Sequence, residues 1–138
     1  MQALVIDSSI ALGFVLKDEQ EPRALRAREL IRQGVSTFVP AHWSVEVANG
    51  LVMAERRKRA SQADTTESLN LIAALPVVTD EETARRVGSE TTALARQYGL
   101  TVYDAVYLEL AMRKGAALAT SDSALAKAAK VAGVEVLP

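Results

Sequence analysis

The sequence predicts an α/β protein in which helices cover both faces of a parallel β-sheet. Five short apolar runs alternate along the chain with longer segments of helical composition. Apolar strands separated by helices are typical of parallel sheets, because each crossover helix covers one face and returns the chain to the same edge. A chain of 138 residues has room for one such domain, residues 1–138. The predicted strands are residues 3–6, 35–39, 76–78, 116–119 and 134–137.

The first predicted strand ends in the feature around which the chain is organised. The apolar run that begins at Ala3 stops at Asp7, and Ser8 and Ser9 follow, either of which can cap a helix that begins there. Asp7 therefore lies at a turn from strand to helix, and ligands of open parallel sheets bind at that edge. Asp7 could instead serve only as a helix cap, so the other acids of the chain must decide between the two interpretations.

Prolines and composition set the elements of the first half. A short apolar helix is predicted at 10–16, and Pro22 suits the first turn of a second helix, which Gly34 is suited to end. Pro40 stops the second strand because it lacks an amide donor. Residues 43–59 have helical composition, apolar at first and basic from residue 56 onwards. Whether that basic end binds phosphate is left open.

Capping patterns and glycines set the elements of the second half. Ser61 with Asp64 resembles a capping box, and so does Thr79 with Glu82. After the second box, apolar residues recur at steps of three and four as far as Gly99, which predicts one helix. The remaining predicted helices are residues 102–113, capped by Thr101, and residues 123–132.

Composition excludes several classes of function. The net charge is -1, so no basic field covers the whole molecule. The absence of cysteine excludes disulfides, thiolate zinc sites and a cysteine nucleophile, and His42 is the only histidine. No apolar run is long enough for a membrane span, and the first residues lack the pattern of a signal peptide. We therefore expect a cytoplasmic protein that makes no membrane contact.

Four acids are expected to converge at one edge of the sheet. Asp7 follows the first strand, Asp122 follows the fourth, and Glu46 and Asp104 each lie in the first turn of a helix. Strand C-termini and the helix N-termini that follow them share one edge of a parallel sheet. Each helical acid could merely favour the helix dipole. Taken together, the four indicate a hard divalent cation, magnesium or manganese before zinc, and an open site of that kind most often serves phosphate chemistry.

Four segments resemble, in order, the motifs of the PIN-domain nucleases. The length and organisation of the chain resemble the VapC toxins of toxin-antitoxin pairs, and the resemblance extends over the whole chain. The segments are Ile6-Asp7-Ser8-Ser9, Glu46-Val47-Ala48-Asn49-Gly50-Leu51, Tyr103-Asp104-Ala105-Val106-Tyr107-Leu108 and Thr120-Ser121-Asp122.

The resemblance implies a three-layer sandwich with a five-stranded parallel sheet of order 3-2-1-4-5. It also implies an endoribonuclease that depends on Mg²⁺ or Mn²⁺, forms a homodimer and is neutralised by a cognate VapB antitoxin. The implied metal-binding and catalytic residues are Asp7, Glu46, Asp104 and Asp122. The implied supporting residues are Asn49 beside the helical acid, Thr120 beside the last acid, and Ser8.

Two other functions are compatible with an acidic site on a parallel sheet. A non-catalytic member of the fold would only dimerise or bind a regulatory partner, but it has no reason to retain four mutually repelling acids. A phosphoacceptor signalling domain would need paired acids after the first strand and a lysine after the last, and neither is present. The sequence does not indicate which RNA is cleaved, or whether one or two ions bind.

Overall fold

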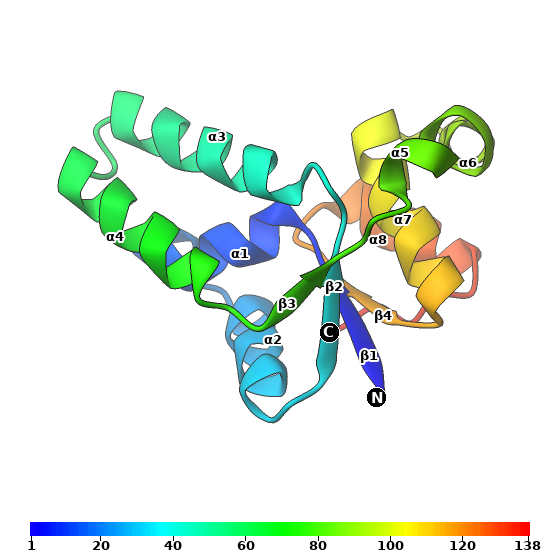
Figure 1. The fold of residues 1–138 in the computed structure, drawn as a ribbon, viewed down its shortest axis with the longest axis horizontal. Coiled ribbons are helices and arrows are strands. Elements are labelled where there is room, and N and C mark those ends of the chain that lie inside the picture. Colours follow the sequence, from blue (N-terminus) through cyan, green and yellow to red (C-terminus); the bar gives the residue numbers. More distant parts are fainter.

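The computed structural model describes residues 1–138 and confirms a parallel sheet between two groups of helices (Figure 1). The strands are β1 (Ala3–Ile6), β2 (Ser36–Val39), β3 (Val77–Thr79) and β4 (Ala117–Ala119). Their order is β3-β2-β1-β4, and each neighbouring pair is parallel. The order 3-2-1-4 agrees with the predicted topology, and β1 lies in the interior of the sheet.

The sheet has four strands, so the expectation of five is corrected. Residues 134–137 form only an isolated parallel bridge, between Val136 and Leu118. Leu118 makes both backbone hydrogen bonds of this bridge, from its amide to the Glu135 carbonyl and from its carbonyl to the Leu137 amide. The strand β4 is three residues long, which leaves little ladder for a fifth strand to continue. The terminal segment still lies beside β4, where the fifth strand was expected.

The helices lie on two sides of the sheet (Figure 1). Figure 1 places α1 to α4 on one side and α5 to α8 on the other, with α7 packed against β1 and β2. The helices are α1 (Ser8–Val15), α2 (Pro22–Arg32), α3 (Trp43–Arg56), α4 (Gln62–Ala73), α5 (Thr83–Arg86), α6 (Thr92–Tyr98), α7 (Val102–Lys114) and α8 (Ser123–Val131). A 3-10 turn spans Lys17–Glu19. None of the helices has the length and apolar character needed to cross a membrane.

Most of the predicted helix ends are confirmed. The Ser61 hydroxyl accepts from the Asp64 amide at 3.0 Å and the Asp64 carboxylate accepts from the Ser61 amide at 3.0 Å, which completes the capping box of α4. Thr101 caps α7 in the expected way. Gly99 and Gly115 end α6 and α7 in the left-handed conformation, which glycine adopts without steric cost.

The predicted capping box of Thr79 and Glu82 is wrong. Thr79 is the last residue of β3, and α5 begins only at Thr83. The Asp80 amide bonds to the Val39 carbonyl at 2.8 Å, so the chain continues along β2 beyond the point where the helix was expected. The single helix predicted as far as residue 98 is also interrupted, by a π-helical turn at Val87–Thr91.

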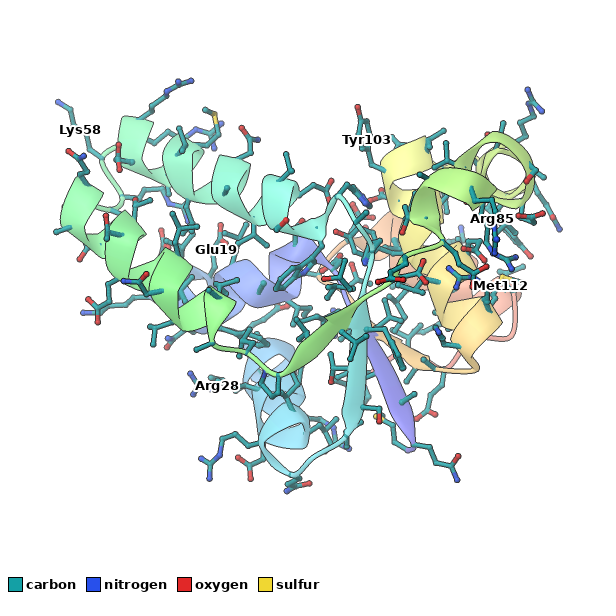
Figure 2. The ribbon with its side chains drawn as sticks, in the orientation of Figure 1. Glu19, Arg28, Lys58, Arg85, Tyr103 and Met112 are labelled. Carbon is teal, nitrogen blue, oxygen red and sulfur yellow. The ribbon has the colours of Figure 1, made fainter.

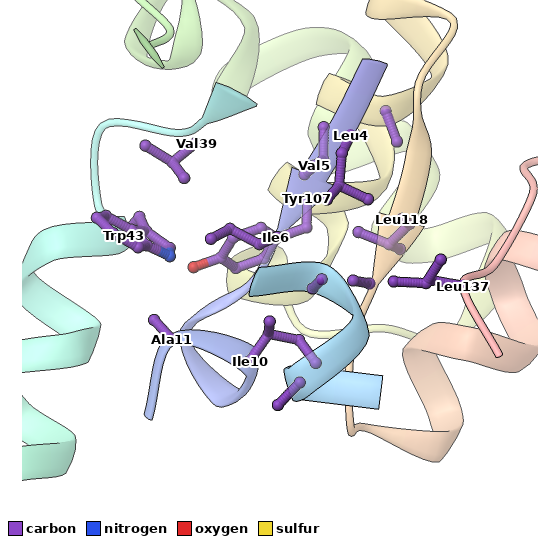
Figure 3. Packing of buried hydrophobic residues seen from close by; sticks show 14 of the residues in the cluster. Leu4, Val5, Ile6, Ile10, Ala11, Val39, Trp43, Tyr107, Leu118 and Leu137 are labelled. Atoms are coloured by element: carbon purple, nitrogen blue, oxygen red, sulfur yellow. The ribbon is translucent and has the colours of Figure 1, made fainter. Parts of the chain in front are cut away.

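The core is built around β1. Leu4, Val5 and Ile6 are fully buried, as expected for a strand covered on both faces. In Figure 3 Tyr107 of α7 lies beside Ile6, with its hydroxyl directed toward Trp43. A buried aromatic ring with one polar atom packs well only where that atom reaches a partner. The core thus brings a hydroxyl to the edge at which β1 ends.

The basic residues 56–59 lie at the C-terminal end of α3 and in the turn that follows it. Arg59 is not free for a ligand, because it pairs with Asp18 at 2.7 Å and with Glu19 at 2.9 Å. Figure 2 shows Lys58 at the far end of α3, whereas Tyr103 projects from the N-terminal end of α7. The basic turn is therefore at the opposite end of α3 from Glu46.

Candidate acidic active site

Asp7 is almost completely buried at the end of β1 and caps α1. Its Oδ1 atom accepts hydrogen bonds from the Ser9 hydroxyl at 2.6 Å and from the Ile10 amide at 3.1 Å. The expectation that Ser8 or Ser9 caps the helix is therefore wrong. The ionised carboxylate offers two acceptor oxygens close to the helix amides, and Ser9 donates its own proton to that carboxylate instead.

Burial raises the pKa of Asp7 from 3.8 to about 6. The hydrogen bonds from Ser9, Thr120 and the Ile10 amide lower the pKa, because each favours the ionised form, but they do not cancel the effect of burial. The charge of Asp104 raises the pKa further. A buried acid with a raised pKa at the carboxyl edge of a sheet is typical of an active site.

Thr120 connects Asp7 to the turn that carries Asp122. Its buried hydroxyl donates to Asp7 Oδ2 and accepts from the Asp122 amide at 3.0 Å. Asp122 caps α8 through a 2.8 Å hydrogen bond from the Leu125 amide to Oδ1. A single hydroxyl thus sets the spacing of the turns that follow β1 and β4, and the two acids come from adjacent strands.

The same turn is held by Arg23 of α2 and by Glu21, the residue before α2, neither of which stands out in the sequence. Arg23 donates to the Thr120 carbonyl at 2.6 Å, and Glu21 accepts from the Ser121 hydroxyl. Ser9 accepts from the Ser121 amide at 3.0 Å. Arg23 is one of several arginines on α2, so the sequence carries no signal that would distinguish it from a solvent-exposed one.

Glu46 lies in the first turn of α3 and is held by Tyr107 of α7. The Tyr107 hydroxyl donates to Glu46 Oε1 at 2.6 Å, and the ring nitrogen Nε2 of His42 lies 3.3 Å from the same oxygen. Burial, followed by the hydrogen bond to Glu46, raises the pKa of Tyr107, with the Ser8 side chain acting in the opposite direction. Ser8 is half-buried. Tyr107 lies in the third of the four motifs, but no local pattern in the sequence indicates this contact with Glu46.

Asp104 is half-buried in the first turn of α7, and its carboxylate interacts electrostatically with the other acids. Burial raises its pKa, and the charges of Asp122 and Glu46 raise it further. Since Asp104 in turn raises the pKa of Asp7, each of the four acids interacts with at least one other. The convergence of the four on one edge of the sheet follows from these interactions and from the positions of the helix ends.

The four acids provide the type of ligand that a hard divalent cation requires, because Mg²⁺ and Mn²⁺ prefer carboxylate oxygens. No group of three or more Asp, Glu or His side chains is gathered closely enough to hold a metal ion. Binding would therefore require the carboxylates to draw together, and the positive charge of the bound ion would offset their mutual repulsion. Asn49 is exposed on α3 and makes no side-chain hydrogen bond.

These features define an α/β protein with an acidic site at the carboxyl edge of a parallel sheet. Within that class, the chain belongs to the PIN domain family, whose model matches residues 4–131. The matched range includes all four acids and, apart from Ala3, every residue of the four strands.

Individual relatives agree with this assignment. The chain is 29% identical over 127 residues to Ribonuclease VapC3 of Mycobacterium tuberculosis, covering 92% of this chain and 88% of that protein. The structure of PAE2754 from Pyrobaculum aerophilum superimposes with a TM-score of 0.71, at 21% identity and covering 98% of this chain and 89% of the other. VapBC2 from Rickettsia felis, bound to a DNA fragment from its promoter, gives 0.66 at 12% identity, covering 97% and 96%. These two structures establish the fold.

Proposed function

We propose that this protein is a metal-dependent endoribonuclease toxin of the VapC kind, which cleaves phosphodiester bonds of RNA. The observation that carries the proposal is the electrostatic interaction among four carboxylates at one edge of the sheet. These are Asp7, Glu46, Asp104 and Asp122. The PIN family and the relative named Ribonuclease VapC3 support the same activity. The net charge of only -1 favours local recognition of the RNA at the site over capture by the whole surface.

The four acids would hold one or two Mg²⁺ or Mn²⁺ ions and serve as the catalytic residues. A bound ion of this kind supplies positive charge for the phosphoryl oxygens and promotes the ionisation of water. Asp7 is held by three hydrogen bonds, so its carboxylate is already ordered before any ligand binds. With a pKa of about 6, Asp7 is mostly ionised at neutral pH and can accept a cation or a proton there.

A VapB-like antitoxin and a second copy of the chain are the proposed partners. Several structures that share the fold are toxin-antitoxin complexes, which supports an antitoxin partner. An arginine from such a partner could pair with the acids, because a guanidinium donates two parallel hydrogen bonds to a carboxylate.

A second candidate is a non-catalytic PIN-fold protein that dimerises and binds a regulatory partner. The observation that favours it is the spacing of the carboxylates, because no three of them lie close enough together to hold a metal ion. The two candidates differ in one respect that can be measured, which is cleavage of RNA when a divalent ion is added.

The test uses purified protein freed of antitoxin and metal, with RNA as the substrate. We expect cleavage with Mg²⁺ or Mn²⁺ and none with excess chelator. The Asp104→Asn variant should cleave RNA about 100-fold more slowly, or more slowly still. Loss of an outer-shell partner of a metal costs up to about 100-fold, and Asp104 is proposed to bind the metal directly. The matched control is Glu67→Gln, which removes an exposed acid of α4.

Melting curves provide a readout that does not depend on cleavage. Asp104→Asn removes a charge whose ionisation is disfavoured, so we expect it to melt higher than the wild type in chelator and to gain less from Mg²⁺. Undiminished cleavage in excess chelator would contradict the metal-dependent mechanism. Dimerisation and partner binding without cleavage under any condition would favour the non-catalytic candidate.

A further inference from the structure

Tyr107 connects the helices on the two sides of the sheet at the edge where the acids lie. The residue belongs to α7, and its side chain is 1% exposed. Its hydroxyl reaches Glu46 of α3, which is 61 positions away in the sequence, at 2.6 Å. Because α3 and α7 lie on opposite sides of β1 and β2 (Figure 1), this contact exists only in the assembled fold.

The bond engages only one oxygen of Glu46. Oε1 accepts from Tyr107 and lies 3.3 Å from His42 Nε2, whereas Oε2 has no hydrogen-bond donor in the protein. A carboxylate can only accept, so the phenol is the donor of this bond. The arrangement leaves Oε2 as the atom of Glu46 that is free to face a ligand.

The contact also restricts a flexible side chain. The Glu46 side chain is 29% exposed, and a glutamate at that exposure would otherwise sample several rotamers. The Tyr107 ring cannot move with it, because the ring packs in the core beside Ile6 (Figure 3). A rigid donor on a flexible carboxylate is the arrangement by which outer-shell partners orient ligands in metal sites.

We propose that Tyr107 is a positioning residue that orients Glu46 for a divalent cation. This inference rests on the proposed function, since it concerns the same acidic site. Loss of an outer-shell partner typically costs 10–100-fold in metal affinity. Tyr107 would therefore act through Glu46 alone and touch neither the ion nor the RNA.

The experiment measures Mn²⁺ binding to metal-free protein by isothermal titration calorimetry, for the wild type and for Tyr107→Phe. The variant keeps the buried ring and removes only the hydroxyl, and we expect its dissociation constant to rise roughly 10–100-fold. The matched control is Tyr98→Phe, which removes the hydroxyl of a half-buried tyrosine on α6 that makes no side-chain hydrogen bond. Its Mn²⁺ affinity should equal that of the wild type.

A double-mutant cycle separates positioning from a general structural effect. If Tyr107 acts through Glu46, adding Tyr107→Phe to Glu46→Gln should produce little further loss of Mn²⁺ affinity, because the orientation it controls no longer matters. An undiminished affinity of Tyr107→Phe, or an equal additional loss in the Glu46→Gln background, would overturn the inference. If the wild type itself does not bind Mn²⁺, the proposed metal site is wrong as well. That outcome differs from the failure of the Tyr107 inference alone, in which the wild type binds Mn²⁺ and Tyr107→Phe binds it equally well.

Discussion

Asp7 accepts three hydrogen bonds, yet burial still raises its pKa to about 6. The native state therefore binds the Asp7 proton more tightly than the unfolded chain does. The contribution of Asp7 to the free energy of unfolding is therefore fully present below about pH 4 and is lost as the pH rises through about 6. A shift of about two pKa units corresponds to roughly 3 kcal/mol. At neutral pH, the ionised carboxylate is thus a cost to the metal-free fold.

Asp7→Asn is expected to remove this cost while retaining the helix cap, because asparagine is as good an N-cap as aspartate. In excess chelator near pH 7, the variant should be more stable than the wild type by about 1–3 kcal/mol, and the difference should disappear near pH 4. The Thr120 hydroxyl can rotate to accept from the amide. Urea denaturation at the two pH values measures the effect.

Glu67→Gln serves as the control for the loss of a negative charge at an exposed position. If Asp7→Asn destabilises the protein equally at both pH values, the hydrogen bonds of the carboxylate outweigh its burial, and the raised pKa would not govern the stability of the site.

At the scale of elements, a partly buried ion network connects α7 to the end of β3. Arg113 donates to both oxygens of Asp80, at 2.9 and 2.7 Å, and to Glu109 at 2.9 Å. The guanidinium lowers the pKa of Asp80 below its usual range. Asp80 therefore contributes stability above its usual pKa, and that contribution is lost as the pH falls through the lowered value.

Arg113→Ala should destabilise the protein by about 3–5 kcal/mol, because two nearly buried carboxylates would be left without their partner. The same change also frees the end of β3 from α7. Chemical denaturation at neutral pH measures the loss, with Arg96→Ala on the exposed face of α6 as the control. A loss below about 1 kcal/mol would place this network among ordinary surface ion pairs.

At the scale of the whole molecule, apolar side chains remain exposed beside the acidic site. Val45 is 69% exposed on α3 and Tyr103 is 66% exposed on α7, each adjacent in sequence to one of the four acids. Figure 2 shows Tyr103 projecting away from the fold. Exposed apolar groups that cluster on one surface indicate an interface, and a two-fold dimer is the commonest assembly of a chain of this kind.

We expect light scattering at micromolar concentration to show a dimer, and Val45→Glu to shift it toward monomer. Val131→Glu is the matched control, because Val131 is 71% exposed at the C-terminal end of α8. A wild-type protein that is monomeric under these conditions would contradict the proposed homodimer. A dimer that both variants leave intact would place the interface on another surface.

The sequence by itself predicted the alternation of strands and helices and the four acids of the candidate site. Buried strands, capping residues such as Thr101 and terminal glycines such as Gly99 act within a few residues of themselves, so their patterns can be recognised locally. The convergence of the four acids follows from the parallel topology, because strands of that kind end at one edge. Those predictions needed no knowledge of side-chain contacts.

Only the tertiary structure decided how the site is held. The bonds from Tyr107 to Glu46 and from Arg23 to Thr120 join residues 61 and 97 positions apart, and no local pattern encodes such pairs. Where local and tertiary preferences compete, the tertiary contacts prevail. Thr79 stays at the end of β3 because Asp80 bonds to Val39 and to Arg113, and the segment after Gly133 forms one bridge because β4 is too short to extend it.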